Sequence, residues 1–223
     1  MSEFEHAFLS PWGYIIDSEN FPDLINTTDF ASYTGGKYGT DSRISPNISS
    51  ASSAIRNFCG WHISPSLDCG MLYNVHDLRD AFVGPDLLIQ LPATFVTNVS
   101  KVVLGAVWDS VEDDWRGELV DDDRIDFGMG GGLVRIYDVG HLDRKSKIFV
   151  RYTAGYDDDF IASVQEIACA SVVRALTNTN GVVSEAAGGV SVSYSAAWSG
   201  KGSTALTNDV RDVLDSYKVR RVF

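Results

Sequence analysis

The chain has 223 residues, of which 44% are apolar and 22% charged, and its formal net charge is −12. Length and composition predict one large domain, or a domain with an insertion, that buries a core. The excess of acids argues against a protein that binds nucleic acid over a broad face, because such binding needs Lys and Arg to neutralise phosphates. The longest apolar runs are far shorter than the roughly 20 residues of a membrane span, and residues 1–10 lack the apolar stretch of a signal peptide, so we expect a cytoplasmic chain at synthesis, without membrane contact.

Residues 1–45 are predicted to form an N-terminal arm. They are rich in aromatic residues, Gly, Ser and Asp, and they show no long periodic run. One short helix is expected near Thr28–Tyr33, because Gly35-Gly36 directly after it favours a helix end.

A longer helix is predicted near residues 46–59. Ser45 suits the capping position, Pro46 the first turn, and Gly60 the position just past the end. The apolar residues at helical spacing are Ile48, Ala51, Ile55 and Phe58. The helix therefore has one face to bury against other elements.

Residues 67–153 predict an antiparallel β unit. Short apolar runs alternate with turn residues, and their length and β-branched content favour strands in MLYNV, DLLIQL, VSKVVLGAV, GLVRIYDV and KIFVRYT. Gly128–Gly132 predicts a turn or a bulged hairpin. The acidic runs Glu112–Asp114 and Asp121–Asp123 do not match the ligand spacing of a calcium loop, so we interpret them as solvated turns.

The chain returns to helix near residues 160–178. The apolar residues at helical spacing are Ile161, Val164, Ile167, Ala168, Val172, Ala175 and Leu176. Gly181 and Gly188-Gly189 then predict a hinge, and a strand follows in which Val190, Val192 and Tyr194 alternate with serines. We expect this strand to reach either a neighbouring subunit or the β unit.

The last helix is predicted near residues 207–219, where acids come early and bases late, in the order that complements the helix dipole. Together these predictions give an α+β fold: a small helical bundle, with helices near 46–59, 160–178 and 207–219, and an inserted antiparallel β unit. The main domain would span residues 46–223, with the β insertion at 67–153 and a C-terminal tail at 217–223.

Candidate metal ligands are sparse. Asp157–Asp159 stand before a helix, where carboxylates cap free N–H groups, so capping is favoured over metal binding. The one set with zinc-ligand residue types is Cys59, His62, Cys69 and His76. Its second pair is too widely spaced, and Cys59 lies beside an apolar stripe. Three cysteines also do not make a disulfide framework. We expect no metal and no other cofactor.

No motif in the sequence supports catalysis. GMGGGL lacks the Lys-Ser/Thr ending of a phosphate loop, the four histidines stand apart, and no Gly-x-Ser-x-Gly elbow is present. We therefore expect a protein that is not an enzyme.

Three segments in a fixed order carry a resemblance to a known family. They are ASSAIRNFCGWHISPS, KIFVRYTAGYDDDFIASVQEIACASVVRAL, and GVVSEAAGGVSVSYS with a closing VLDSYKVRRV. They resemble the head–tail connector (adaptor, or head-completion) proteins of long-tailed bacteriophages over residues 45–68 and 147–222. The matching positions are Gly60, Trp61, Tyr152, Gly155, Tyr156, Gly181, Val182, Glu185, Gly188, Ser191, Tyr194, Tyr217, Arg220 and Arg221.

The resemblance implies a structural subunit of the virion neck that is assembled in the host cytoplasm. Twelve copies would form a ring that docks under the portal protein after DNA packaging and provides a platform for the stopper or tail-completion protein. DNA would pass through the lumen without specific binding, and an acidic lumen would let it slide.

Two hypotheses concern particular residues. The basic and aromatic end of the chain would dock on an acidic groove of the portal through Tyr217, Lys218, Arg220, Arg221 and Phe223, although a helix end that complements its dipole explains the same charges. Val190, Val192 and Tyr194 would make the strand that reaches another subunit or the β unit.

The alternative function is a β-rich carbohydrate- or metal-binding module, or a hydrolase whose site forms only in the fold.

Overall fold

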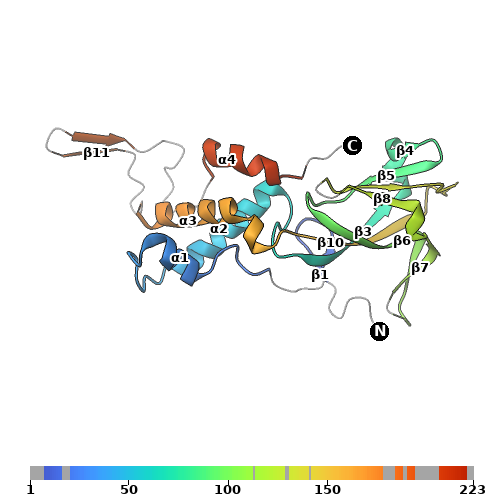
Figure 1. The fold of residues 1–223 in the computed structure, drawn as a ribbon, viewed down its shortest axis with the longest axis horizontal. Coiled ribbons are helices and arrows are strands. Elements are labelled where there is room, and N and C mark those ends of the chain that lie inside the picture. The colour runs from blue at the N-terminus through green and yellow to red at the C-terminus, as the bar shows by residue number, and fades with distance from the viewer. Residues whose placement is uncertain are drawn as a thin grey trace. The chain divides into compact units, whose positions relative to one another are not determined.

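The structure, a computed structural model, describes residues 8–16, 21–112, 114–128, 131–140, 142–177, 184–187, 190–193 and 206–219 (Figure 1). The chain divides into two compact units. The β unit falls within Met1–Phe21, Gly60–Asp157 and Val219–Phe223, and the helical unit within Pro22–Cys59 and Asp158–Lys218.

The larger sheet of the β unit has six antiparallel strands in the order β1-β2-β3-β10-β6-β7. Its strands are β1 (Phe8–Leu9), β2 (Ile15–Ile16), β3 (Leu67–Asn74), β6 (Val96–Asp109), β7 (Asp114–Leu119) and β10 (Lys147–Ala154). Strand β10 pairs with β3 over its whole length, so that Phe149 stands opposite Leu72 on one side and Val103 on the other. The predicted strand KIFVRYT is therefore a central strand of this sheet.

The smaller sheet has four antiparallel strands in the order β4-β5-β9-β8. Its strands are β4 (Phe82–Val83), β5 (Asp86–Gln90), β8 (Ile125–Phe127) and β9 (Leu133–Ile136), and the short 3-10 turns η1 (Val75–Ala81) and η2 (Asp122–Arg124) precede β4 and β8. Between β8 and β9, the Gly128 N–H donates to the carbonyl of Leu133 at 3.3 Å. The predicted hairpin at Gly128–Gly132 is thus confirmed by the pairing of the strands on either side of it.

The core of the β unit lies around β10. Ile148, Phe149 and Val150 are each 0% exposed, which means that both faces of this strand are covered. Full burial of one such side chain contributes about 1.5–3 kcal/mol. The Tyr73 hydroxyl of β3 donates to the carbonyl of Gln90 of β5 at 2.8 Å and so ties the two sheets together.

The helical unit contains α1 (Thr27–Thr34), α2 (Ile44–Cys59), α3 (Ala162–Thr177) and α4 (Asn208–Leu214), with 3-10 turns η3 (Asp158–Phe160) before α3 and η5 (Asp215–Tyr217) after α4. The predicted short helix is confirmed as α1. Asn26 and Asp29 form a capping box at its start, and Gly35 ends it with a φ of 57°, a conformation that favours glycine.

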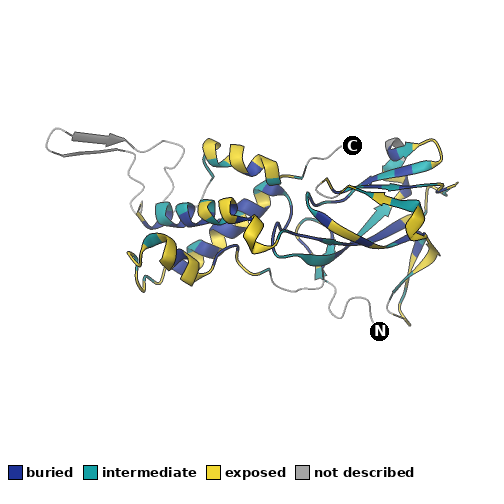
Figure 2. Ribbon diagram, in the orientation of Figure 1, coloured by how far each residue is buried: buried dark blue, intermediate teal, exposed yellow. Residues whose placement is uncertain are grey.

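Helices α2 and α3 contact each other along their apolar stripes. The buried residues on these stripes include Ile48, Ala51, Ile55, Val164, Ala168 and Val172. Figure 2 shows exposed residues on the rest of α2, whereas much of the rest of α3 is half-buried. Small residues such as Ala51 and Ala168 allow close approach of two helices. The segment before α1 is fixed to α2, because Leu24 N–H donates to Ser52 Oγ at 3.0 Å and Arg56 donates to the carbonyl of Pro22 at 2.7 Å.

The last helix is shorter than the predicted 207–219. It ends at Leu214 and tightens into η5, where Lys218 N–H donates to the carbonyl of Asp215 at 3.3 Å. A short hairpin of β11 (Ser184–Ala187) and β12 (Val190–Ser193) lies between α3 and α4 in the sequence. Val190 and Val192 belong to β12, which pairs with β11, whereas Tyr194, Gly181 and Gly188-Gly189 lie outside the described residues.

The fold class predicted from the sequence, a small helical bundle with an inserted β unit, is wrong. The protein is mostly β, with sheets of six and four strands against four helices in the part of the chain that the structure describes. The β unit is not a simple insertion either, because β1 and β2 come from residues before the first helix and β2 pairs with β3. The error has a physical origin: the long helices repeat their pattern over 16 residues, whereas strands of two residues are too short to display a two-residue period.

Candidate functional site

The motif residues of the β unit meet in one buried aromatic cluster. Trp61 is 0% exposed, and its ring centroid lies 5.8 Å from that of Tyr156. The Tyr156 N–H donates to the carbonyl of Ile63 at 2.7 Å, and the Gly155 N–H donates to the carbonyl of Phe95 at 3.1 Å. These residues therefore join the segment after α2 to the segment after β10.

Gly155 is required at this junction for two reasons. Its φ is +129°, a conformation that side chains rarely adopt, and a Cβ atom added there would lie 2.2 Å from the carbonyl oxygen of Pro65. The glycine and the two aromatic residues that carry the resemblance thus have an architectural role in this chain.

His62 is one of the four residues considered as zinc ligands, and both of its ring nitrogens make hydrogen bonds within the fold. Its ring is 0% exposed, with Nδ1 2.7 Å from the Tyr14 hydroxyl and Nε2 3.0 Å from the carbonyl of Ala154. Because a carbonyl only accepts, Nε2 carries the proton and Nδ1 accepts from the Tyr14 hydroxyl. That hydroxyl in turn accepts from the His62 backbone N–H at 3.1 Å. Neither ring nitrogen is left to bind a metal.

The cysteines are placed as small buried side chains. All three are free and buried. Burial raises the pKa of the Cys59 thiol to about 12 and that of Cys169 to about 11, and it raises the pKa of Cys69 even further above its usual range. Zinc is bound by thiolates, so these groups are poorly suited to it. Among the described residues, no three His, Cys, Asp or Glu side chains are grouped to hold a metal ion.

The predicted docking residues are only partly described. The Lys218 ammonium lies 4.8 Å from the centre of the Phe58 ring, and the Arg211 guanidinium lies 5.8 Å from it. The Tyr217 hydroxyl is 3.5 Å from the carbonyl of Phe160. Arg220, Arg221 and Phe223 lie outside the described residues. Both described members of the set thus contact their own helical unit.

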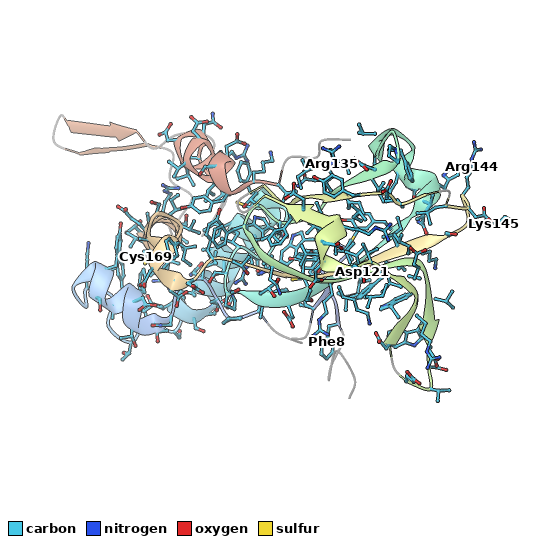
Figure 3. The ribbon with its side chains drawn as sticks, turned by 45° about the vertical axis from the view of Figure 1, so that its right-hand side comes forward. Phe8, Asp121, Arg135, Arg144, Lys145 and Cys169 are labelled. Atoms are coloured by element: carbon cyan, nitrogen blue, oxygen red, sulfur yellow. The ribbon has the colours of Figure 1, made fainter. Side chains whose placement is uncertain are left out.

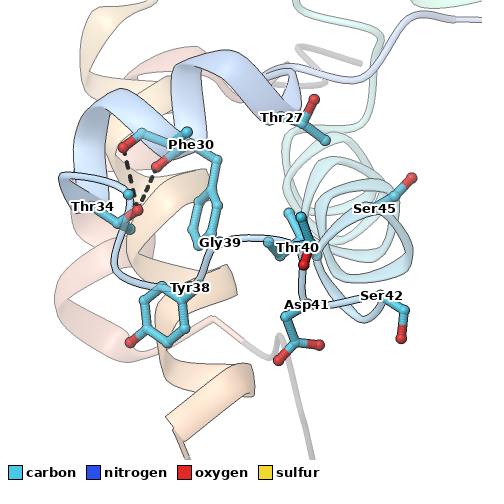
Figure 4. Close-up of a pocket in the computed structure, with 12 residues that line it drawn as sticks. Thr27, Phe30, Thr34, Tyr38, Gly39, Thr40, Asp41, Ser42 and Ser45 are labelled. Carbon is cyan, nitrogen blue, oxygen red and sulfur yellow. Dashed lines mark hydrogen bonds between the residues drawn. The ribbon is translucent and has the colours of Figure 1, made fainter.

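A pocket of about 230 Å³ lies beside α1 (Figure 4). Hydroxyl groups are frequent in its lining, with Thr27, Thr34, Thr40, Ser42 and Ser45. Its carboxylate, Asp41, binds Arg43 at 2.6 Å, and this hydrogen bond lowers the pKa of Asp41 to about 2. An anion held by an arginine at neutral pH is a poor general base, so the lining does not support acid–base catalysis.

The feature that the sequence did not reveal is the surface around the β6–β7 hairpin. A bulge interrupts the pairing between Leu104 and Val107, and Gly105 adopts a φ of +65° there. Gly117 lies opposite, where a Cβ atom would come within 2.4 Å of the Leu104 carbonyl oxygen. Gly117 therefore allows a close approach of the strands that a side chain would prevent, and Gly105 permits the left-handed backbone of the bulge.

Two tryptophans pair across this hairpin. Trp108 stands opposite Trp115 with ring centroids 5.2 Å apart, and the Trp115 ring stacks on Phe149, also at 5.2 Å. Trp115 therefore covers the buried Phe149, while Trp108 remains 44% exposed. Val107 (67% exposed), Val111 (91%) and Leu119 (60%) add further exposed apolar surface.

Ion pairs hold the hairpin in shape. The Lys101 ammonium lies 2.8 Å from the Asp114 carboxylate, and Arg116 binds both Asp109, at 2.7 Å, and Glu112. Asp109 also accepts the N–H of Val111 at 2.9 Å. This backbone hydrogen bond, supported by the nearby Arg116 charge, lowers the pKa of Asp109. The turn is therefore fixed by side chains, and Val111 is held outward at its end.

An open groove of about 410 Å³ runs beside this hairpin. It is lined by Gly105, Ala106, Val107, Trp108, Trp115, Asp143, Lys145, Ser146 and Lys147. The segment 143–147 leads into β10, and Arg144 and Lys145 project outward from it (Figure 3). We call this feature the Trp-Lys groove. It combines aromatic surface with cations and suits binding better than chemistry.

No protein-family model and no curated protein matches this chain in comparisons with known proteins. Within the described residues, no helix has the length and apolar character needed to cross a membrane.

Proposed function

We propose that this chain is a structural subunit of the head–tail connector ring of a long-tailed bacteriophage. The observation that carries the proposal is the ordered set of segments around Gly60-Trp61, Tyr152–Tyr156 and the C-terminal helix. It does not depend on the helical-bundle fold expected from the sequence, which was wrong. The ring would contain twelve copies, dock under the portal protein and offer the attachment platform for the stopper or tail-completion protein.

The surface of the β unit supports an assembly role. Val107, Trp108, Val111 and Leu119 are exposed apolar residues gathered on one hairpin. Exposed apolar side chains that adjoin one another mark interaction sites, and Val107 and Trp108 line the same groove. The ion pairs of Asp109, Glu112 and Arg116 hold the hairpin in one conformation, which lowers the entropy cost of binding through it.

The charge of the chain supports the passage of DNA. A formal net charge of −12 per copy becomes a large negative charge on a ring of twelve, and like charge repels the DNA backbone. Such a ring would surround the exiting DNA without retaining it. The protein would thus act in the virion neck, after assembly in the host cytoplasm, and not as an enzyme.

The C-terminal segment is proposed to contact the portal. Tyr217 and Lys218 lie at the end of the helical unit, and Arg220, Arg221 and Phe223 continue the basic and aromatic sequence. Deleting residues 219–223 tests this and keeps Lys218 on the Phe58 ring. We expect the truncated chain to keep its fold and to lose capture by the portal protein. Unchanged capture would show that the segment has no docking role.

Val190, Val192 and Tyr194 are also proposed to form a strand that reaches a neighbouring subunit or the β unit.

The proposed function itself is tested on virus particles. Isolated necks are expected to contain this chain in twelve copies, and an epitope tag on it should place labels between head and tail in electron micrographs. Complete absence of the chain from purified necks would contradict the proposal.

A further inference from the structure

The lining of the Trp-Lys groove suits a binding partner that has both acidic and apolar groups. Lys145 and Lys147 line it together with Trp108 and Trp115, and Arg144 is exposed beside them. Asp143 also lines the groove, but its carboxylate accepts the backbone N–H of Lys145 at 3.1 Å. The cations therefore outnumber the acids at this place in a chain whose overall charge is −12.

A segment of matching chemistry exists on the same chain, in the 3-10 turn η3. Asp158 and Asp159 are exposed, and the Phe160 side chain that follows them is 65% exposed. The turn is fixed to the helix after it, since the Ile161 N–H donates to the carbonyl of Asp158 at 3.2 Å. Two carboxylates and one aromatic ring thus stand together on a defined turn, as the complement of lysines beside tryptophans.

The groove and the acidic turn belong to different compact units of the chain. Lys147 begins β10 and Ala154 ends it, and an eight-residue strand separates its ends by about 23 Å. Gly155 and Tyr156 are then held at the Ala154 end by hydrogen bonds to Phe95 and Ile63. Asp158 follows two residues later, and two residues span at most about 7 Å. Along the chain, strand β10 thus separates the Lys145–Lys147 side of the groove from the acidic turn.

We propose that the Trp-Lys groove of one copy receives the η3 turn of the next copy. Asp158 and Asp159 pair with Lys145, Lys147 and Arg144, and the Phe160 ring packs against Trp108. Because the two surfaces differ, the contact is head-to-tail, and repeated contacts of this type generate closed rings or open filaments. This inference rests on the proposed function and names the surfaces that join ring subunits.

Charge reversal tests the contact in the full chain. One double variant, Lys145→Glu with Lys147→Glu, reverses the charge of the groove. The other, Asp158→Lys with Asp159→Lys, reverses the charge of the turn. Each double variant is expected to weaken self-association about 100-fold, because like charges oppose each other across the contact. The variant that carries all four changes, and the equimolar mixture of the two double variants, should both return to within about tenfold of the wild type, since opposite charges then meet again.

The control is Asp122→Lys with Asp123→Lys, which makes the same charge change on η2, where both residues are exposed. It should leave self-association unchanged. The assays are sedimentation velocity of the purified proteins and electron microscopy of the assemblies. Association of the wild type should also weaken as salt rises, because exposed charges are screened over about 8 Å at 0.15 M ionic strength.

The outcomes separate this contact from the proposed function. Rings that survive both reversals would overturn the contact and leave the connector role standing. Reversal-sensitive filaments or short oligomers that never close, alone or with the portal protein, would support the contact and count against the ring. The contact would also be overturned if the wild type stayed monomeric at about 100 µM, which is well above the micromolar range of weak specific interfaces. The composition of isolated necks would then decide the proposed function by itself.

Discussion

Gly155→Ala is expected to destabilise the β unit strongly. At a φ of +129° the new side chain is strained, at a cost of about 1–3 kcal/mol. Its Cβ would also lie 2.2 Å from the Pro65 carbonyl oxygen and 2.7 Å from the Ser66 Cα. Both are backbone atoms, so relief requires the backbone to move rather than a side chain to rotate.

Such a movement weakens the hydrogen bonds of Gly155 and Tyr156 to Phe95 and Ile63. Each contributes about 0.5–1.5 kcal/mol. Together with the strain, the free energy of unfolding should fall by about 2–6 kcal/mol. The measurement is urea unfolding followed by tryptophan fluorescence, with the slope m checked to be unchanged.

Gly84→Ala is the matched control. Gly84 also has a positive φ, +67°, but nothing lies within 4 Å of a Cβ atom placed there. Its substitution should cost only the left-handed conformation, about 1–2 kcal/mol. If Gly155→Ala proved no more destabilising than Gly84→Ala, the close approach of the Gly155 and Pro65 segments would be refuted.

Three further predictions concern buried or ion-paired groups. Tyr14→Phe should lower the free energy of unfolding by about 2–4 kcal/mol in urea titrations, because His62 Nδ1 and the His62 N–H both lose their partner in a buried site; a loss under 0.5 kcal/mol would contradict the assigned hydrogen bonds. The Asp41 carboxyl should titrate by NMR near pH 2 because of its hydrogen bond to Arg43. Since this pKa is lowered on folding, the contribution to stability is present above pH 4, is lost as pH falls through about 2, and should vanish in Asp41→Asn; an NMR pKa near 3.8 would refute the ion pair. Cys59, buried and with its pKa raised to about 12, should react with iodoacetamide at pH 8 at least about 100-fold more slowly in the native protein than in urea, and equal rates would contradict its burial.

Local signals in the sequence predicted local structure well. Gly35-Gly36 correctly marked the end of α1, because a left-handed residue is needed there. Gly128–Gly132 likewise predicted the β8–β9 hairpin. The long helices could be predicted because their apolar residues repeat over 16 positions. Such features are decided within a few residues of one another.

Features that depend on distant residues could not be predicted in the same way. His62 resembled a metal ligand in the sequence, but its partner Tyr14 lies 48 residues earlier. Asp158 and Asp159, expected directly before a helix, lie in the 3-10 turn η3, and α3 begins at Ala162. The pairing of Trp108 with Trp115 required the register of the hairpin, which no local pattern specifies when a bulge is present.

The predicted fold class, with more helix than sheet, was wrong for a related reason. Each two-residue strand of the larger sheet is defined by its partner and not by its own sequence, as Ile15 and Ile16 are by Gly70 and Cys69. Their contribution to the β unit therefore becomes visible only in the fold. The motif residues Trp61, Gly155 and Tyr156, by contrast, were singled out by the sequence, and the structure brings them into one junction.

The most direct test of the connector role is the mass of the assembly that the full chain forms with its portal protein. One copy weighs 24.3 kDa, so twelve copies add about 290 kDa to the portal ring. Native mass spectrometry of the co-expressed proteins should show this added mass as one closed species. A portal ring that carries no copy of the chain, with the chain recovered as a monomer or a two-fold dimer, would contradict the proposed function.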